Sequence, residues 1–186
     1  MSHTLRKECK LVTLELENNV QLQGLLNTRI NTQSNQTPLV MIVHGWLGCA
    51  NSLYLLPLAS ALYKKGFNIF RLNLRDHGGT EHLNRELFHS CRLEEVLHAT
   101  QDIQEKFSHS EFILIGFSLG GNFVLRIGAH AEKFNLKIKK IISICPVMDP
   151  VNTLNETNSM FEFYSAYYLR KWKKVLHEKH KYFPND

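Results

Sequence analysis

A serine flanked by two glycines has the most evident chemical use of any residue in this chain. Gly116, Ser118 and Gly120 form a G-x-S-x-G motif between a predicted buried strand at 111–117 and a predicted helix at 119–134. A serine raised out of a sheet on a sharp turn requires neighbours without side chains, because the strand and the helix approach each other closely there. The motif therefore predicts that Ser118 is a nucleophile that attacks an acyl carbon.

Two backbone amides near this serine are candidates for stabilising the oxyanion of a tetrahedral intermediate. The Leu119 amide directly follows the serine and lies at the predicted N-terminus of a helix, where amides point outward and the dipole favours negative charge. The second donor is expected in the loop 44–48 (HGWLG), which follows another buried apolar run. In that loop the Trp46 amide is the preferred donor, and Leu47 is the alternative.

Three of the histidines that precede the serine lie in loops that follow predicted strands. In the loop 44–48, His44 is expected to hold the backbone by hydrogen bonds, while Gly45 lets the loop approach a substrate carbonyl. His77 and His82 follow a later strand, beside Arg75 and Asp76, which are expected to brace that loop by ion pairing and capping. Folds with a G-x-S-x-G elbow place the catalytic histidine after the serine, so none of the three is assigned as the general base.

The elements that must position these residues follow from the hydrophobic pattern. Two alternating segments predict an antiparallel hairpin, and four continuous apolar runs predict strands buried on both faces. Helical segments separate the apolar runs, so a doubly wound, mostly parallel sheet is expected, with ligands beyond the carboxyl ends of its strands. The expected strands are 9–16, 20–27, 38–43, 67–74, 111–117 and 139–144, and the expected helices are 51–65, 92–107, 119–134 and 160–182.

From about Leu39 onward the chain resembles the α/β-hydrolases of the YheT or EMB8 type. The resemblance is carried by HGWLG at 44–48, NLRDHGGTEH at 73–82, ELFHSCRLEEV at 86–96, GFSLGGN at 116–122, ISICPVMDP at 142–150 and FYSAYYLRKWKK at 163–174. It implies an α/β-hydrolase fold and a serine hydrolase of carboxylic esters, lipid esters among them, with Ser118 as nucleophile. It implies neither a metal nor an organic cofactor. Acyl transfer by the same residues is a further alternative.

The resemblance also implies that the triad Asp and His lie on strands later than 139–144. The chain is therefore expected to be truncated after about the sixth strand, with 1–149 as the N-terminal part of the hydrolase core and 150–186 as an incomplete start of the cap or lid helices. We expect such a chain to be inactive or incomplete by itself, and a non-catalytic remnant or interaction module is the alternative function. Its open sheet edge is expected to permit self-association.

A triad could also be completed within the chain. Asp149 follows the sixth predicted strand, and His177 and His180 follow it in turn, which gives the permitted order Ser, Asp, His. Against this, both histidines lie in a lysine-rich helix whose cations disfavour an imidazolium, and Asp149 is also a natural turn or cap residue. The local triad therefore remains an alternative to an acid and a base supplied by later strands.

Charge and composition limit the partners. The formal net charge is +5, and the segment 170–181 contains six Lys or Arg residues and one Glu, so the rest of the chain is neutral. This distribution gives no basic face for nucleic acid. Two interpretations of the basic segment stay open: peripheral contact of Arg170–Lys181 with an anionic membrane, or a solvated outer face on a cap helix whose aromatic side covers the crevice. No membrane span or signal peptide is recognisable, which predicts a cytoplasmic protein.

The four cysteines do not form a metal-binding or redox pattern. Cys9, Cys49, Cys91 and Cys145 are far apart and lack CxxC or CxxxH pairing. They are expected to be reduced and mostly buried thiols, without a chemical role.

Overall fold

A computed structural model describes residues 5, 8–29, 37–153 and 162–185 of the chain. Within these residues, six strands form one sheet in the order β1-β2-β4-β3-β5-β6. The β1–β2 and β2–β4 pairs are antiparallel, whereas the β4–β3, β3–β5 and β5–β6 pairs are parallel. The strands are β1 Lys10–Glu15, β2 Gln21–Asn27, β3 Leu39–Val43, β4 Asn68–Asn73, β5 Phe112–Phe117 and β6 Ile138–Ile144. The predicted mostly parallel sheet with an N-terminal antiparallel hairpin is therefore confirmed.

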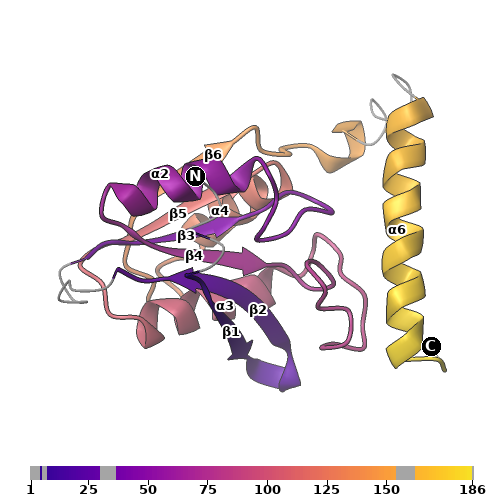
Figure 1. Cartoon of the computed structure of the whole chain (residues 1–186), viewed down its shortest axis with the longest axis horizontal. Coiled ribbons are helices and arrows are strands. Elements are labelled where there is room, and N and C mark those ends of the chain that lie inside the picture. Colours follow the sequence, from indigo (N-terminus) through magenta and orange to yellow (C-terminus); the bar gives the residue numbers. More distant parts are fainter. Residues whose placement is uncertain (1–4, 6–7, 30–36, 154–161, 186) are drawn as a thin grey trace.

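The sheet is covered by helices on both faces, which explains its continuous apolar strands (Figure 1). In β3, all five residues are buried and alternate between two apolar clusters. Val40 and Ile42 pack with residues of α2 (Leu55–Lys64), whereas Leu39, Met41 and Val43 pack with residues of α3 (Leu93–Lys106) and α4 (Leu119–Ala129). Successive side chains of a strand point to opposite faces, so a strand between two helical layers has no polar side.

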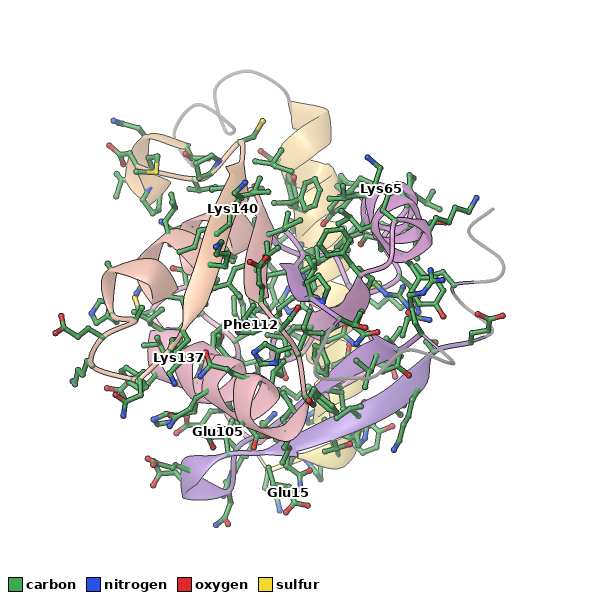
Figure 2. All side chains as sticks on the ribbon, turned by 90° about the vertical axis from the view of Figure 1, so that its left-hand side faces the viewer. Glu15, Lys65, Glu105, Phe112, Lys137 and Lys140 are labelled. Atoms are coloured by element: carbon green, nitrogen blue, oxygen red, sulfur yellow. The ribbon has the colours of Figure 1, made fainter. Side chains whose placement is uncertain are left out.

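The outer strands are less protected. Figure 2, seen from the end opposite the last helix, shows Phe112 in the interior and Lys140 on the outer strand β6. Phe112 is 1% exposed, whereas Ile142 of β6 is 40% exposed because no helix of the described chain covers that side. At the other end of the sheet, the β1–β2 hairpin turns through η1 (Glu17–Asn19), where Asn18 and Asn19 adopt the positive φ angles that asparagine tolerates.

Two helices are shorter than their sequence pattern predicts. The α2 helix begins at Leu55, four residues later than expected, because Ser52 first closes a turn: its hydroxyl accepts a hydrogen bond from the Cys49 amide at 2.9 Å. The α4 helix ends at Ala129 instead of 134, and turns follow up to Asn135, whose φ is positive. Both differences arise from local turn geometry that apolar periodicity does not encode.

The last helix, α6 (Glu162–Tyr182), is not part of the helical layers. It lies along the edge of the sheet formed by the carboxyl ends of β3, β4 and β5 (Figure 1). Within the described residues, no helix combines the length and the hydropathy that crossing a membrane requires.

The four cysteines are free thiols, as predicted, but the expectation that they are mostly buried is wrong. Cys91 and Cys145 are exposed, and Cys9 and Cys49 are partly exposed. Cys91 lies in a surface loop before α3, and Cys145 directly follows the uncovered outer strand β6.

Candidate active site

Ser118 occupies a strained turn between β5 and α4. Its φ is 52° and its ψ is −115°, a conformation that a residue with a side chain adopts only when its surroundings enforce it. The Ser118 amide donates to the carbonyl of Ile144 at 2.9 Å, which fixes the turn to the end of β6. The residue is exposed, so the hydroxyl is accessible at the carboxyl edge of the sheet.

Two glycines make this turn sterically feasible. A Cβ atom at Gly116 would collide with the backbone of Gly120, and a Cβ atom at Gly120 would collide with the carbonyl groups of Val43 and His44. The strand, the elbow and the loop after β3 therefore touch through their backbones. This close approach is the reason that the motif needs glycine on both sides of the serine.

The three amides that the sequence offers as oxyanion donors differ in whether they are already hydrogen bonded. The Leu47 amide donates to Nε2 of His77 at 3.0 Å. Within the described chain no acceptor is recorded for the Trp46 amide, and Leu119 is the first residue of α4, where helical amides lack an acceptor inside the helix. Trp46 and Leu119 thus retain donors that a ligand could use, whereas Leu47 does not.

His44 is a fully buried hydrogen-bonding link between the loop after β3 and the end of β4. Its Nε2 accepts the Leu74 amide proton at 3.1 Å, so Nδ1 carries the ring proton and donates to the Gly45 carbonyl at 2.7 Å. Burial, followed by the neighbouring His77, lowers the pKa of His44 from 6.5 to about 3. The ring is neutral at physiological pH.

His77 makes a second link of the same kind. Its Nε2 accepts from Leu47, so Nδ1 carries the proton and donates to the Arg75 carbonyl at 2.6 Å. Burial is the main cause that lowers the pKa of His77 below its ordinary value, and the ring centroids of His77 and His44 are 4.9 Å apart. Both ring nitrogens of each histidine are therefore engaged with the backbone.

The loop after β4 contains two buried ion pairs. Nε and Nη2 of Arg75 both donate to Oε2 of Glu95, at 3.0 and 2.7 Å. Lys179 of α6 donates to Oδ1 of Asp76 at 2.6 Å, and the two side chains are 6% and 1% exposed. The predicted ion pairing of Arg75 and Asp76 is thereby confirmed, since a buried charge requires such a partner.

Lys179 is a residue that sequence reasoning missed. The segment 170–181 was expected to present a solvated or membrane-facing basic surface, but Lys179 is 5% exposed and also donates to the Glu86 carbonyl at 3.0 Å. Its signal in the sequence is weak because the segment offers six similar cations. Only the rotation of α6 about its axis selects the one that is buried.

Aromatic side chains of α6 cover the loop that carries Trp46. Tyr168 stacks on the Trp46 indole with ring centroids 5.1 Å apart and planes 16° from parallel. Trp172 meets the same indole edge-on at 6.3 Å, and Tyr182 contacts His82 near the other end of the helix. The aromatic side of α6 therefore faces the carboxyl edge of the sheet.

The residues of the alternative local triad lie in separate places. Asp149 precedes a helical turn at 150–153, where its two carboxylate oxygens accept hydrogen bonds from the Asn152 amide and side chain at 3.0 and 2.7 Å. His177 and His180 are exposed on α6. Among the residues with described positions, no hydrogen bond joins Asp149 to either histidine.

A groove of about 920 Å³ lies away from Ser118. It is bordered by the β1–β2 turn, the loop before α3 and the segment after α4, and its walls include Arg75 and Glu95. Oε1 of Glu95 is buried there without a hydrogen-bond partner, and burial raises the pKa of this carboxyl group. The groove contains neither Trp46 nor Leu119, so it is not the space above the serine. In the part of the chain that the structure describes, no cluster of three His, Cys, Asp or Glu residues could hold a metal ion.

Comparison with known proteins agrees with this architecture. A family model described as "alpha/beta hydrolase fold" matches residues 38–181. The Escherichia coli (strain K12) protein YheT, whose name proposes an esterase, is 28% identical over 92 residues, which are 50% of this chain and 27% of YheT. A Haemophilus influenzae protein, whose name proposes an esterase or lipase, is 30% identical over 130 residues, which are 67% of this chain and 40% of that protein.

Solved structures share the fold at lower sequence identity. The esterase Pf2001 of Pyrococcus furiosus is 20% identical with a TM-score of 0.67, and the match covers 87% of this chain and 60% of that one. Est1E of Butyrivibrio proteoclasticus, solved with ferulic acid bound, is 19% identical with a TM-score of 0.62, covering 73% and 53%. The chain spans less than two thirds of the length of each of these four proteins. The resemblance and the fold class predicted from the sequence are confirmed.

Proposed function

The chain belongs to the alpha/beta hydrolase fold family, and from this premise we propose that it carries the nucleophile and the oxyanion-binding amides of a serine hydrolase of carboxylic esters. The observation that carries the proposal is the backbone of Ser118, with φ at 52° and ψ at −115° between β5 and α4. A strained, exposed serine at the carboxyl edge of a parallel sheet is suited to attack a carbonyl group from the crevice.

In the proposed reaction, Oγ of Ser118 forms a bond to the acyl carbon and the carbonyl oxygen becomes an oxyanion. The Trp46 and Leu119 amides would donate to that oxyanion, since both retain hydrogen-bonding capacity and Leu47 is engaged with His77. Collapse of the intermediate expels the alcohol, and water then cleaves the acyl-serine ester. Acyl transfer would use an alcohol in place of that water.

The described residues show no hydrogen-bonded proton acceptor for Oγ of Ser118. His44 and His77 each use both ring nitrogens for backbone hydrogen bonds, and Oγ of Ser118 has no recorded partner in the described chain. We therefore propose as general base a histidine that follows the serine, which is either His177 or His180, with Asp149 as the acid, or a histidine outside the described residues. Loss of a triad member lowers the rate by several powers of ten, so a chain with a positioned base can be distinguished from a chain without one by its reaction rate.

The substrate class that we propose is a carboxylic ester, with lipid esters included. The names of the two curated relatives, which propose an esterase and an esterase or lipase, support this class. The aromatic side chains of Tyr168 and Trp172 beside Trp46 would give an apolar wall for an acyl chain.

The test is labelling with a fluorophosphonate, which forms an ester bond between its phosphorus atom and an activated serine and releases fluoride. The purified chain is treated with the reagent, and the adduct is located by peptide mass spectrometry. Labelling at Ser118 that is lost in Ser118→Ala supports a positioned nucleophile and base. Ser108→Ala, which alters a serine in the loop before β5, is the matched control and should label normally.

Two further variants identify the base. If labelling depends on the local triad, His177→Gln or His180→Gln should abolish it. If a folded sample shows no labelling at Ser118, the alternative of a non-catalytic hydrolase-like module is favoured instead.

A further inference from the structure

The backbone amide and the backbone carbonyl of Leu47 are each hydrogen bonded to a residue that is distant in sequence. Its amide donates to Nε2 of His77 at 3.0 Å, and its carbonyl accepts from Nζ of Lys171 at 3.2 Å. Leu47 has a φ of 54°, a conformation that is unfavourable for a residue with a Cβ atom and persists only when contacts enforce it. Lys171 of α6 is therefore one of two groups that stabilise the backbone immediately after Trp46.

The Trp46 side chain is held by the same helix. Its indole stacks on Tyr168, and Trp172 meets it edge-on. Lys171 and Trp172 follow Tyr168 by three and four positions, so each lies beside Tyr168 on the same side of α6. Both the backbone and the side chain of the segment 46–47 are thus in contact with α6.

A buried ion pair fixes the rotation and the height of the helix. Lys179 lies two turns beyond Lys171, and its ammonium group reaches Asp76 and the Glu86 carbonyl. Asp76 also accepts the Phe88 amide proton through Oδ2 at 2.8 Å, so the carboxylate belongs to the loop after β4. The two side chains of this ion pair are 6% and 1% exposed. Any movement of α6 that separated them would leave a buried charge without its partner, so the pair opposes such movement.

We propose that Lys171 and Lys179 are positioning residues through which α6 holds the segment 46–47 in the conformation that presents the Trp46 amide toward Ser118. Lys179 fixes α6 to the loop after β4 through Asp76. Lys171 and Tyr168 of the same helix then hold the loop after β3 through Leu47 and Trp46. The consequence for oxyanion binding rests on the proposed function, whereas the coupling of α6 to the loop does not. Displacement of α6 would accordingly weaken the oxyanion site without any change at Ser118 itself.

Intrinsic fluorescence tests the coupling directly, because the only two tryptophans of the chain, Trp46 and Trp172, both lie in this contact. Lys171→Met and Lys179→Met are compared with Lys173→Met, which removes an equal charge from the exposed side of the same helix. We expect a red-shifted emission and stronger acrylamide quenching in the first two variants, and wild-type behaviour in the third. Lys171→Arg retains a donor for the Leu47 carbonyl and should restore the wild-type spectrum.

Two additional measurements separate the coupling from general destabilisation and from the proposed chemistry. Hydrogen exchange of the Leu47 amide should accelerate in Lys171→Met under conditions where circular dichroism confirms a folded chain. The rate of fluorophosphonate labelling at Ser118 should fall roughly tenfold, the effect of losing one charge-assisted hydrogen bond.

The outcomes are distinct. Unchanged fluorescence in both folded lysine variants, together with unchanged Leu47 exchange in Lys171→Met, would overturn the coupling. If Lys179→Met does not fold, Lys171→Met and its arginine counterpart decide the question alone. Absence of labelling at Ser118 in the wild-type chain would count against the proposed function, while the fluorescence and exchange results would still decide the coupling.

Discussion

Nε2 of His77 accepts the amide proton of Leu47 at 3.0 Å and so joins the loop after β4 to the loop after β3. This bond decides which amide of the loop 44–48 retains hydrogen-bonding capacity, since it engages Leu47. It also requires that His77 be neutral, because a protonated imidazole has no acceptor nitrogen. The geometry of the proposed oxyanion site thus depends on the protonation state of a buried histidine.

Acidification should destabilise the fold through His44 and His77. Their pKa values are lowered from 6.5, to about 3 for His44, so the unfolded chain binds protons that the folded chain excludes. Their contribution is fully present above pH 6.5 and is lost as the pH falls toward the folded pKa values. For His44 alone the loss at pH 5 is about 2 kcal/mol.

Urea unfolding between pH 7.5 and 5 measures this effect, and nitrogen-15 spectra of the imidazole rings report the tautomer. We expect the Nδ1-protonated neutral form of His44 throughout this range, and a titration midpoint below 6.5 for His77, because burial lowers its pKa. A ring that titrates near pH 6.5 in the folded state would contradict the assignment for that histidine.

Two of the three glycines in α4, Gly120 and Gly128, should respond differently to substitution by alanine. Gly120→Ala brings a Cβ atom against the rigid backbone of Val43 and His44, whereas Gly128→Ala meets only the flexible end of the Ile141 side chain. We expect Gly120→Ala to lower the free energy of unfolding by about 2 kcal/mol or more, and Gly128→Ala to be much milder because alanine favours helix. Thermal unfolding of the two variants checks the order, and equal losses would argue against the close backbone approach at the elbow.

Removal of the charge from Arg75 should destabilise the fold more than removal of the charge from Glu95. Arg75→Met leaves a carboxylate buried without its partner, which costs about 3–5 kcal/mol. Glu95→Gln retains an acceptor for Arg75. Burial raises the pKa of Glu95, which means that its charged form is already disfavoured, so a smaller loss of unfolding free energy is expected. Denaturant midpoints at pH 7 measure both variants; a larger loss in Glu95→Gln than in Arg75→Met would refute this description of the pair.

The outer strand β6 is a candidate surface for self-association of this chain. Its backbone edge is unpaired within the described sheet, and Ile142 beside Lys140 is 40% exposed. A charge on an edge strand opposes pairing with another chain, so Ile142→Lys should shift any dimer toward monomer. Sedimentation velocity over a range of concentrations checks this, with Leu11→Lys on the opposite edge strand as the control. Association that persists in Ile142→Lys and disappears in Leu11→Lys would assign the contact to β1 instead.

Local patterns in the sequence determined the elements and the position of the elbow. Continuous apolar runs predicted β3, β4 and β5 within one residue at either end, and the glycines at 116 and 120 located Ser118 at a strand-to-helix junction. These features were predictable because burial on both faces and a close backbone approach constrain residue type at the position itself.

The tertiary structure alone decided which long-range partners meet. Nothing in the sequence distinguishes Lys179 from the other cations of the segment 170–181, yet the rotation of α6 buries it against Asp76. The sequence also left Leu47 open as an alternative to Trp46, and only the approach of His77 from another loop engages the Leu47 amide. Hydrogen bonds and ion pairs between distant segments depend on relative placement of elements, which is a property of the packed core and not of any local pattern.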